Sequence, residues 1–439
     1  MSPFSESFWS EREIWSRDRL ADFQLRALRT QLDRVARTSG FYRDRLAEVG
    51  LEPGDLTDLE DLAALPVTTK ADYVAALERR PPWGDALSVE LDDVVRVHYS
   101  SGTTGAPTPV CWTADDLDRW ADLYARCAYA QGVRAGDVYQ CLFSFAWFVG
   151  GLGAVAGYQR IGATCIPGGS ADTERQIDTI LRYRVTAVGG TPSFLTHLAE
   201  TARNTGRPLD AGRVRRAMVG GEPGGCVPAA RALIERLWNA KCYDGYGSLE
   251  FQPIAWECTE QAGGHLAEDF CLAEVVDPET RRPVPDGTPG VLVLTHLDKQ
   301  ASPLIRWWTG DVVVRDSGRC RCGRTHARLP GGVRGRADDM LVVRGVNLFP
   351  SAVENIVRRQ PHTTGEYLIV LDDDVRDPVS GFLTGVKLRV ETLPDAPADF
   401  ADALHRSIRA ELTVRADVER VPAGSLPRST HKAHRVVRE

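Results

Sequence analysis

The sequence predicts an α/β protein: a large N-terminal domain of helix-flanked sheets with a β-rich subdomain, followed by a small α+β C-terminal domain. Between residues 137 and 247, apolar β-type runs alternate with helical segments, which is the pattern of a parallel sheet covered by helices. From 270 to 315, short strands follow one another with turns between them, and residues 340–439 mix strands with helices again. We therefore predict two domains, residues 1–337 and 338–439.

Composition limits the class of protein. A chain of 439 residues with 43% hydrophobic and 26% charged residues is typical of a soluble globular protein with two or more domains. A net charge of −7 argues against a nucleic-acid partner. The N-terminus lacks the pattern of a signal peptide and no apolar run reaches the ~20 residues of a membrane span, so we expect no membrane partner. Ten cysteines are too few for a disulfide scaffold, which favours reduced thiols and a cytoplasmic location.

The N-terminal third should be mainly helical and should lead into a hairpin. Residues 18–38 have the apolar spacing of an amphipathic helix, and residues 68–72 resemble a capped helix start. Short strands are expected at 94–98 and 110–112, and a helix at 115–131. The segment between the two strands is therefore predicted to lie at a hairpin.

That segment, Tyr99-Ser-Ser-Gly-Thr-Thr-Gly105, is rich in hydroxyl groups and glycine. Glycine permits close approach to the backbone, and successive N–H groups in such a turn can surround a phosphate. The sequence is not a Walker A loop, because the Gly-Lys-Ser/Thr ending is missing. The alternative is an ordinary polar surface turn.

In the alternating region, polar and glycine-rich turns follow the predicted strands. Ligands of parallel sheets bind at the carboxyl ends of the strands, where these turns lie. The expected strands are 138–143, 163–166, 187–190 and 216–219, with helices at 149–160, 173–184, 193–204 and 227–238.

Four residues outside that loop could carry chemistry. Tyr246 could stack on a purine, and Glu250 could bind Mg²⁺. Asp311 follows Thr309-Gly310 and could bridge ribose hydroxyls, and Lys432 lies in a basic tail. The structural alternatives are a core tyrosine, a turn aspartate and a solvated tail.

In this order and spacing, these motifs resemble those of the adenylate-forming superfamily, and within it the phenylacetate–CoA ligase-like branch, from about residue 18 to the C-terminus. The resemblance implies that the loop Ser100, Ser101, Gly102, Thr103, Thr104 and Gly105 binds phosphate. It implies nucleotide-binding roles for Gly221, Glu222, Pro223, Tyr243, Asp244, Tyr246, Gly247, Asp311 and Arg336.

The resemblance also implies a two-step reaction with a mobile small domain. Glu250 would lie near Mg²⁺, and Lys432 would contact the substrate carboxylate and phosphate during adenylation. Asp338 would be the hinge about which the small domain rotates. The other lysines considered, Lys241 and Lys299, sit in no comparable motif.

The matching segment in relatives lies beside an aromatic acid, which implies a substrate-binding role for Phe143, Phe145, Trp147, Phe148 and Gly151. Aromatic walls with small residues between them would accommodate a flat ring. The alternative is core packing, because aromatic runs are more often buried than functional.

Three cysteines and one histidine form a full donor set for structural zinc: Cys258, His265, Cys320 and Cys322. The alternatives are reduced cysteines in a turn, or His326 as the fourth ligand.

The expected function is ATP-dependent activation of an aromatic (aryl or arylacetic) carboxylic acid as an acyl-adenylate, then thioester formation with CoA. The alternatives are transfer to a carrier-protein thiol, an amine or nitrite, and a nucleotide-binding zinc protein without turnover. Relatives in this branch are often dimers, so a homodimer is a further expectation.

Overall fold

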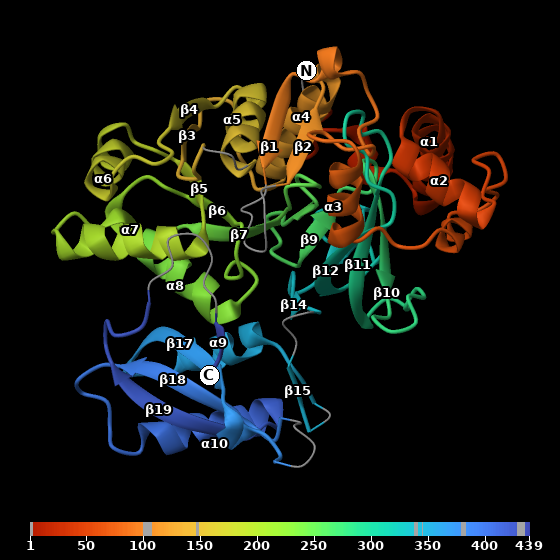
Figure 1. Cartoon of the computed structure of the whole chain (residues 1–439). Coiled ribbons are helices and arrows are strands. Elements are labelled where there is room, and N and C mark those ends of the chain that lie inside the picture. The colour runs from red at the N-terminus through yellow and green to blue at the C-terminus, as the bar shows by residue number, and fades with distance from the viewer. Residues whose placement is uncertain are drawn as a thin grey trace.

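The computed structural model confirms the predicted fold class. It describes residues 3–99, 108–145, 149–337, 341–344, 346–378, 383–427 and 435–439, with the backbone alone at 342 and 347. Figure 1 shows a large N-terminal part and, below it, a smaller C-terminal part drawn in blue.

The N-terminal segment is helical. Its long helix buries Leu28, Leu32 and Val35 on one face, as the apolar spacing predicts. The elements are η1 (Glu11–Ile14), α1 (Arg17–Thr38), α2 (Gly40–Val49), η2 (Glu60–Ala64), α3 (Lys70–Arg79) and η3 (Leu91–Asp93).

An eight-stranded sheet forms the centre of the large part, in the order β13-β9-β8-β7-β6-β5-β3-β4. The five strands β3 to β7 are parallel; four of them were predicted, and the fifth, β7, was not predicted as a strand, because part of it was interpreted as a glycine-rich turn. The strands are β3 (Val138–Cys141), β4 (Thr164–Pro167), β5 (Ala187–Gly190), β6 (Arg216–Gly220), β7 (Lys241–Tyr246), β8 (Ala255–Trp256), β9 (Gly264–Leu266) and β13 (Arg328–Leu329).

Helices cover both faces of the parallel strands. Helices α4 (Ala114–Ala130) and α5 (Gly150–Ile161) share a buried cluster with Tyr139 and Met218. Helices α6 (Thr173–Arg182), α7 (Pro192–Asn204) and α8 (Pro228–Trp238) pack on the other face, and η4 (Leu209–Ala211) precedes β6 (Figure 1).

The β-rich subdomain is a four-stranded antiparallel sheet, β10-β11-β12-β14. Its strands are β10 (Cys271–Val276), β11 (Pro289–His296), β12 (Trp307–Val314) and β14 (Gly335–Arg336). The predicted hairpin is confirmed by β1 (Arg96–Tyr99) and β2 (Pro109–Trp112), which pair antiparallel on either side of residues outside the description.

The C-terminal part is a four-stranded sheet, β19-β18-β17-β20, packed against two helices. Its elements are β15 (Leu341–Val343), β16 (Val346–Leu348), α9 (Pro350–Arg359), β17 (Thr363–Leu371), η5 (Asp373–Val375), β18 (Val386–Thr392), α10 (Phe400–Leu412), β19 (Ala416–Pro422) and β20 (Val436–Arg438). Phe349 contacts the large part: it packs on Gly335 and the valines of the antiparallel sheet.

The first residues described are bound to distant parts of the chain. The indole N–H of Trp9 donates to Asp122 (2.7 Å), and Glu13 pairs with Arg324 (2.6 Å) in a buried position. The N–H of Thr325 donates to the carbonyl oxygen of Glu13 (3.1 Å). The N-terminal segment thus covers the turn after β12.

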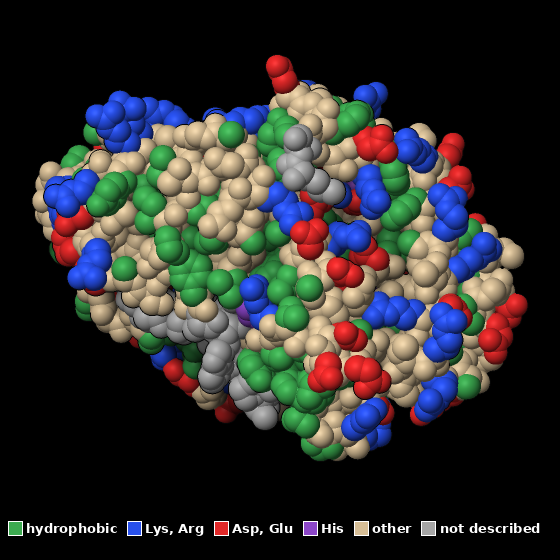
Figure 2. Space-filling model, turned by 90° about the horizontal axis from the view of Figure 1, so that it is seen from above, with side chains coloured by type: hydrophobic (Ala, Val, Ile, Leu, Met, Phe, Trp, Pro, Cys, Tyr) green, Lys and Arg blue, Asp and Glu red, His purple; other side chains and the backbone are tan. Residues whose placement is uncertain are grey.

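The surface and the helices show two further general features. On the face in Figure 2, basic and acidic side chains are interspersed rather than gathered by sign. Among the described residues, no helix has both the length and the apolar character needed to cross a membrane.

Candidate functional site

Three of the predicted nucleotide residues lie together where the two sheets of the large part meet. The phenol of Tyr246, the last residue of β7, donates to Asp311 Oδ2 (2.5 Å), in the middle of β12. Arg336 on β14 lies opposite Asp311, with 3.4 Å between its guanidinium and Oδ1. Burial and the neighbouring Asp311 raise the pKa of Tyr246 well above its usual value. This Tyr246–Asp311–Arg336 cluster joins residues up to 90 positions apart in the printed sequence.

The turn after β6 brings Glu222 toward α7. Gly221 adopts φ +87°, a conformation that glycine tolerates best, and Pro223 continues the turn. The N–H of Ser193, in the first turn of α7, donates to Glu222 Oε1 (2.7 Å). Burial raises the pKa of Glu222; Glu354 of the C-terminal part adds to the increase and Arg435 opposes it. Glu222, in the large part, is therefore close enough for charges on the C-terminal part to affect its pKa.

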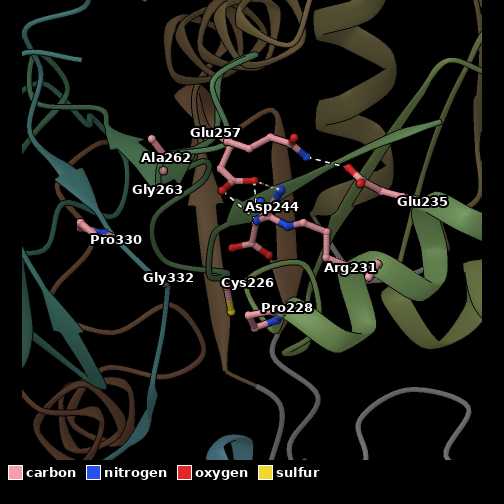
Figure 3. A pocket seen from close by; sticks show the side chains of 14 residues that line it. Cys226, Pro228, Arg231, Glu235, Asp244, Glu257, Ala262, Gly263, Pro330 and Gly332 are labelled. Carbon is pink, nitrogen blue, oxygen red and sulfur yellow. Dashed lines mark hydrogen bonds and ion pairs between the residues drawn. The ribbon is translucent and has the colours of Figure 1, made fainter. Parts of the chain in front are cut away.

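Asp244 lies beside a cavity of about 460 Å³ between the start of α8 and the loops around 261–264 and 330–332 (Figure 3). Glu257 accepts the N–H of Asp244 (2.9 Å) and binds Arg231 through both oxygens (2.8 Å each). Burial, and then Glu257, raise the pKa of Asp244 to about 7. Asp244 is thus an aspartate that titrates near neutrality at the edge of the nucleotide motif.

The two remaining predicted residues of this motif differ in environment. Tyr243 is buried, with 4% of its surface exposed, and pairs with Met218 of β6. Side chains alternate along a strand, so Tyr243 points to the opposite face from Asp244 and Tyr246. Gly247 lies against Gln252, 3.3 Å from a Cβ built at that position.

Glu250 has a partner that the sequence did not reveal. Glu250 is 9% exposed, and its Oε1 lies 3.2 Å from Lys70 Nζ at the start of α3. The sequence indicated a capped helix start at residues 68–72, and Thr69 does cap α3. It gave no signal that Lys70 would reach a carboxylate 180 positions later.

The proposed acyl segment is described in part. Phe145 lies against two glycines: a Cβ built at Gly151 would be 3.0 Å from the Phe145 ring, and one at Gly169 would be 2.5 Å away. Phe143 and Phe145 also pack against the buried cluster of α4 and α5. The space beside these glycines is therefore occupied by the ring of Phe145. The sequence interpretation had instead expected small residues there to leave room for a substrate ring.

Other predicted site residues lie outside the described part of the chain: Ser100, Ser101, Gly102, Thr103, Thr104, Gly105, Trp147, Phe148, Asp338 and Lys432. The other two lysines considered are both described. Lys299 is 1% exposed, lies 3.3 Å from Asp116 and covers the ring of Trp112 at 3.1 Å, so it is committed to the interior. Lys241 is exposed at the first residue of β7, the opposite end from Tyr246.

The four predicted zinc ligands converge. The ligand atoms of Cys258, His265, Cys320 and Cys322 all lie within 4.8 Å of one another. Contact with the Cys258 thiol, and then with His265, lowers the pKa of the Cys322 thiol. The fold brings the two halves together because β13 pairs with β9, which places Arg328 opposite His265.

The surroundings favour His265 over His326 as the fourth ligand. His265 Nδ1 lies 3.3 Å from the carbonyl oxygen of His326, which leaves Nε2 facing Cys322 at 3.6 Å. This is the arrangement of a metal-ligating histidine whose other nitrogen donates to a carbonyl. Both ring nitrogens of His326 lie 3.0 Å from backbone carbonyls, so neither is available.

Comparison with known proteins identifies the family of the chain. The family described as AMP-binding enzyme matches residues 31–296, and the AMP-binding enzyme C-terminal domain matches residues 345–439. The chain therefore belongs to the AMP-binding enzymes of the adenylate-forming superfamily. It is 36% identical to the phenylacetate-coenzyme A ligase of Thermus thermophilus, over 95% of this chain and 96% of the relative. It is 34% identical to the phenylacetate-coenzyme A ligase of Escherichia coli, over 97% and 96% of the two chains.

A solved structure shows the same architecture. The crystal structure of a 2-hydroxyisobutyryl-CoA ligase in the postadenylation state, in complex with 2-HIB-AMP, superposes with a TM-score of 0.92 at 30% identity, over 99% of this chain and 93% of that one. The same ligase in the thioesterification state gives a TM-score of 0.74. The present arrangement of the two parts thus resembles the postadenylation state more closely.

Proposed function

We propose that this ATP-dependent acid–CoA ligase acts on an aromatic carboxylic acid of the aryl or arylacetic type. It activates its acid as an acyl-adenylate with release of pyrophosphate, and then forms the CoA thioester with release of AMP. The full-length similarity to phenylacetate-coenzyme A ligases supports the aromatic class. The single observation that carries a nucleotide role for the site is the cluster of Tyr246, Asp311 and Arg336.

We assign roles to the site as follows. Tyr246 stacks on the adenine, Asp311 binds the ribose hydroxyls and Arg336 holds Asp311 in place. Gly221 and Glu222 form the opposite wall, next to the start of α7. The loop 100–105 binds phosphate, and Lys432 neutralises the two anions that must approach each other during adenylation.

The residues present fit both metals. Glu250 offers a largely buried carboxylate, the kind of oxygen ligand that magnesium prefers; magnesium would neutralise charge on the phosphates. The sulfur and imidazole donors of Cys258, His265, Cys320 and Cys322 match the ligands of structural zinc. We assign the zinc a role in stability, because the four protein ligands complete a tetrahedral site.

We also propose a boundary at residues 337/338, with Asp338 as the hinge of a mobile C-terminal domain. The different TM-scores against two states of one ligase support that mobility. A homodimer, a carrier-protein acceptor and a cytoplasmic location remain predictions; ten free cysteines are consistent with the last of these.

The deciding experiment measures pyrophosphate release with ATP and Mg²⁺ across benzoic, phenylacetic, hydroxycinnamic and aliphatic acids, with and without CoA. We expect release and thioester formation with one aromatic class. Including 2-hydroxyisobutyric acid tests a second candidate, which the structural similarity to the corresponding ligase favours. Turnover of that acid alone would replace the aromatic proposal, and release without a CoA effect would indicate another acceptor.

A further inference from the structure

Lys70 is the first residue of α3 and reaches the proposed magnesium ligand. Its ammonium lies 3.2 Å from Glu250 Oε1; the Lys70 side chain is 42% exposed and that of Glu250 11%. One end of this ion pair is therefore fixed in the protein, and the other is open to solvent. An ion pair with so exposed a cation contributes little to stability, so folding alone gives little reason for it.

The start of α3 is held firmly against the strand that carries Asp311. The N–H of Thr68 donates to the carbonyl oxygen of Arg306 (2.7 Å), and the N–H of Trp308 donates to that of Thr68 (2.8 Å). Thr69 closes the helix N-terminus through its contacts with Asp72. The base of the Lys70 side chain thus has a defined position relative to the ribose end of the site.

The same helix also contacts one end of the proposed phosphate loop. The phenol of Tyr73 donates to the carbonyl oxygen of Pro109 (3.0 Å), the first residue of β2. Tyr73 follows Lys70 by three positions, so both project from the same side of α3. Lys70 therefore lies beside Glu250, on the side of α3 that contacts the β1–β2 hairpin.

We propose that Lys70 is a second cation for the triphosphate of ATP. It pairs with Glu250 here, moves onto the β- and γ-phosphates when ATP binds, and stabilises the departing pyrophosphate. In that step a carboxylate oxygen forms a bond to the α-phosphorus, the bond from that phosphorus to the bridging oxygen breaks, and pyrophosphate leaves with the electron pair. A point charge on a long, flexible stem suits a leaving group that must then depart. This inference rests on the proposed function.

The contrast between ATP and AMP tests it, because AMP lacks the two phosphates that Lys70 would contact. In calorimetric titrations without acid, Lys70→Met should raise the Kd for ATP about tenfold to a hundredfold, the loss expected for a hydrogen bond to a charged group. The Kd for AMP should stay within about twofold, and Lys70→Arg should restore much of the ATP affinity. An unchanged ATP affinity, or an equal loss for ATP and AMP, would overturn the inference.

A second pair of variants separates direct contact from positioning of Glu250. Adding Lys70→Met to Glu250→Gln should weaken ATP binding further; no further loss would mean that Lys70 acts only through Glu250. Lys241→Met, at the exposed start of β7, is the matched control and should bind both nucleotides like the wild type. If the wild type releases no pyrophosphate with any acid, the proposed function is overturned. If the wild type does release pyrophosphate, but Lys70→Met leaves the ratio of the Kd for ATP to the Kd for AMP unchanged, only this inference is overturned.

Discussion

The carboxyl group of Asp244 shows how the nucleotide motif changes the chemistry of single residues. Its burial and the nearby Glu257 raise its pKa to about 7, whereas an aspartate in an unfolded chain titrates near ~3.9. Between these two values the unfolded chain is ionised and the folded chain is protonated. The contribution of Asp244 to the free energy of unfolding is thus fully present below the pKa of the unfolded chain, and it is lost as the pH rises through the pKa of the folded chain.

Asp244→Asn removes this titration. As the pH rises from 5 to 8, the free energy of unfolding of the variant should increase relative to that of the wild type by on the order of 2–3 kcal/mol. The reason is that the wild type must accommodate a buried carboxylate at the higher pH. Urea unfolding at the two pH values measures the difference. Asp92→Asn, at an exposed position, is the control and should show no such trend; an equal effect of Asp244→Asn at both pH values would contradict the raised pKa.

At this scale the sequence could predict residue types but not their partners. Tyr246, Glu250 and Asp311 could be chosen because each follows a recognisable motif. The ion pair of Lys70 with Glu250 has no local pattern, because residues 180 positions apart meet only in the folded chain. For the same reason, the sequence did not show that Phe145 would fill the space beside Gly151.

Among the elements, the central parallel strands were the easiest to predict, and the turn that carries Cys320 and Cys322 was the hardest to place. Strands β5 and β6 lie in the middle of the parallel strands and are buried apolar runs, whereas the edge strand β4 is partly exposed and β7 is largely polar. Strands β8 and β13 have two residues each and β9 has three, too few for any periodicity. These short antiparallel strands nevertheless bring together the four proposed zinc ligands, which the sequence could identify only by residue type.

Replacing two zinc ligands tests that element. Cys320→Ser with Cys322→Ser should reduce bound zinc from about one ion per chain to none, since two of four ligands are lost. The melting temperature should fall by about 5 °C or more, because metal binding contributes directly to folding. Metal analysis and thermal unfolding provide the readouts, with the partly buried Cys165→Ser as control. A zinc-free wild type with the same melting temperature as the variant would remove the site.

The packing of α5 on α4 depends on glycine. A Cβ at Gly157 would lie 2.3 Å from Tyr124 Cβ, and one at Gly153 would lie 2.4 Å from the Tyr124 ring. Gly157→Ala should therefore lower the free energy of unfolding by about 1–3 kcal/mol, the usual cost of overpacking. Gly54→Ala, where nothing lies within 4 Å of the added Cβ, should be nearly neutral in the same denaturant titration. Equal stability of the two variants would show that the helices can separate without cost.

For the whole molecule, the proposed rotation of the C-terminal part would determine which half-reaction can proceed. Phe349 packs on the antiparallel sheet, and the hydroxyl of Ser351 donates to the carbonyl oxygen of Arg334. With these contacts in place, the two parts of the chain are arranged more like the postadenylation state of a related ligase than like its thioesterification state. The sequence predicted two parts, but a relative orientation depends on weak contacts that no sequence pattern encodes.

Lys432→Ala tests whether the steps are separable. The variant should lose adenylation, measured as acid-dependent exchange between ATP and pyrophosphate, by about a hundredfold or more. It should retain thioester formation from preformed acyl-adenylate, because thiol attack does not require a cation at that position. Lys241→Ala should behave like the wild type. Equal loss of both steps would show that Lys432 is not the adenylation lysine.

The binding of the N-terminal segment to the turn after β12 has a consequence for synthesis on the ribosome. Trp9 and Glu13 leave the ribosome early, yet Arg324 and Thr325, the partners of Glu13, emerge only after three hundred further residues. Long-range contacts of this kind form late in folding. The N-terminal segment must therefore stay free of its final position while the large part is being made, and a nascent chain halted before residue 324 should leave Glu13 open to proteolysis.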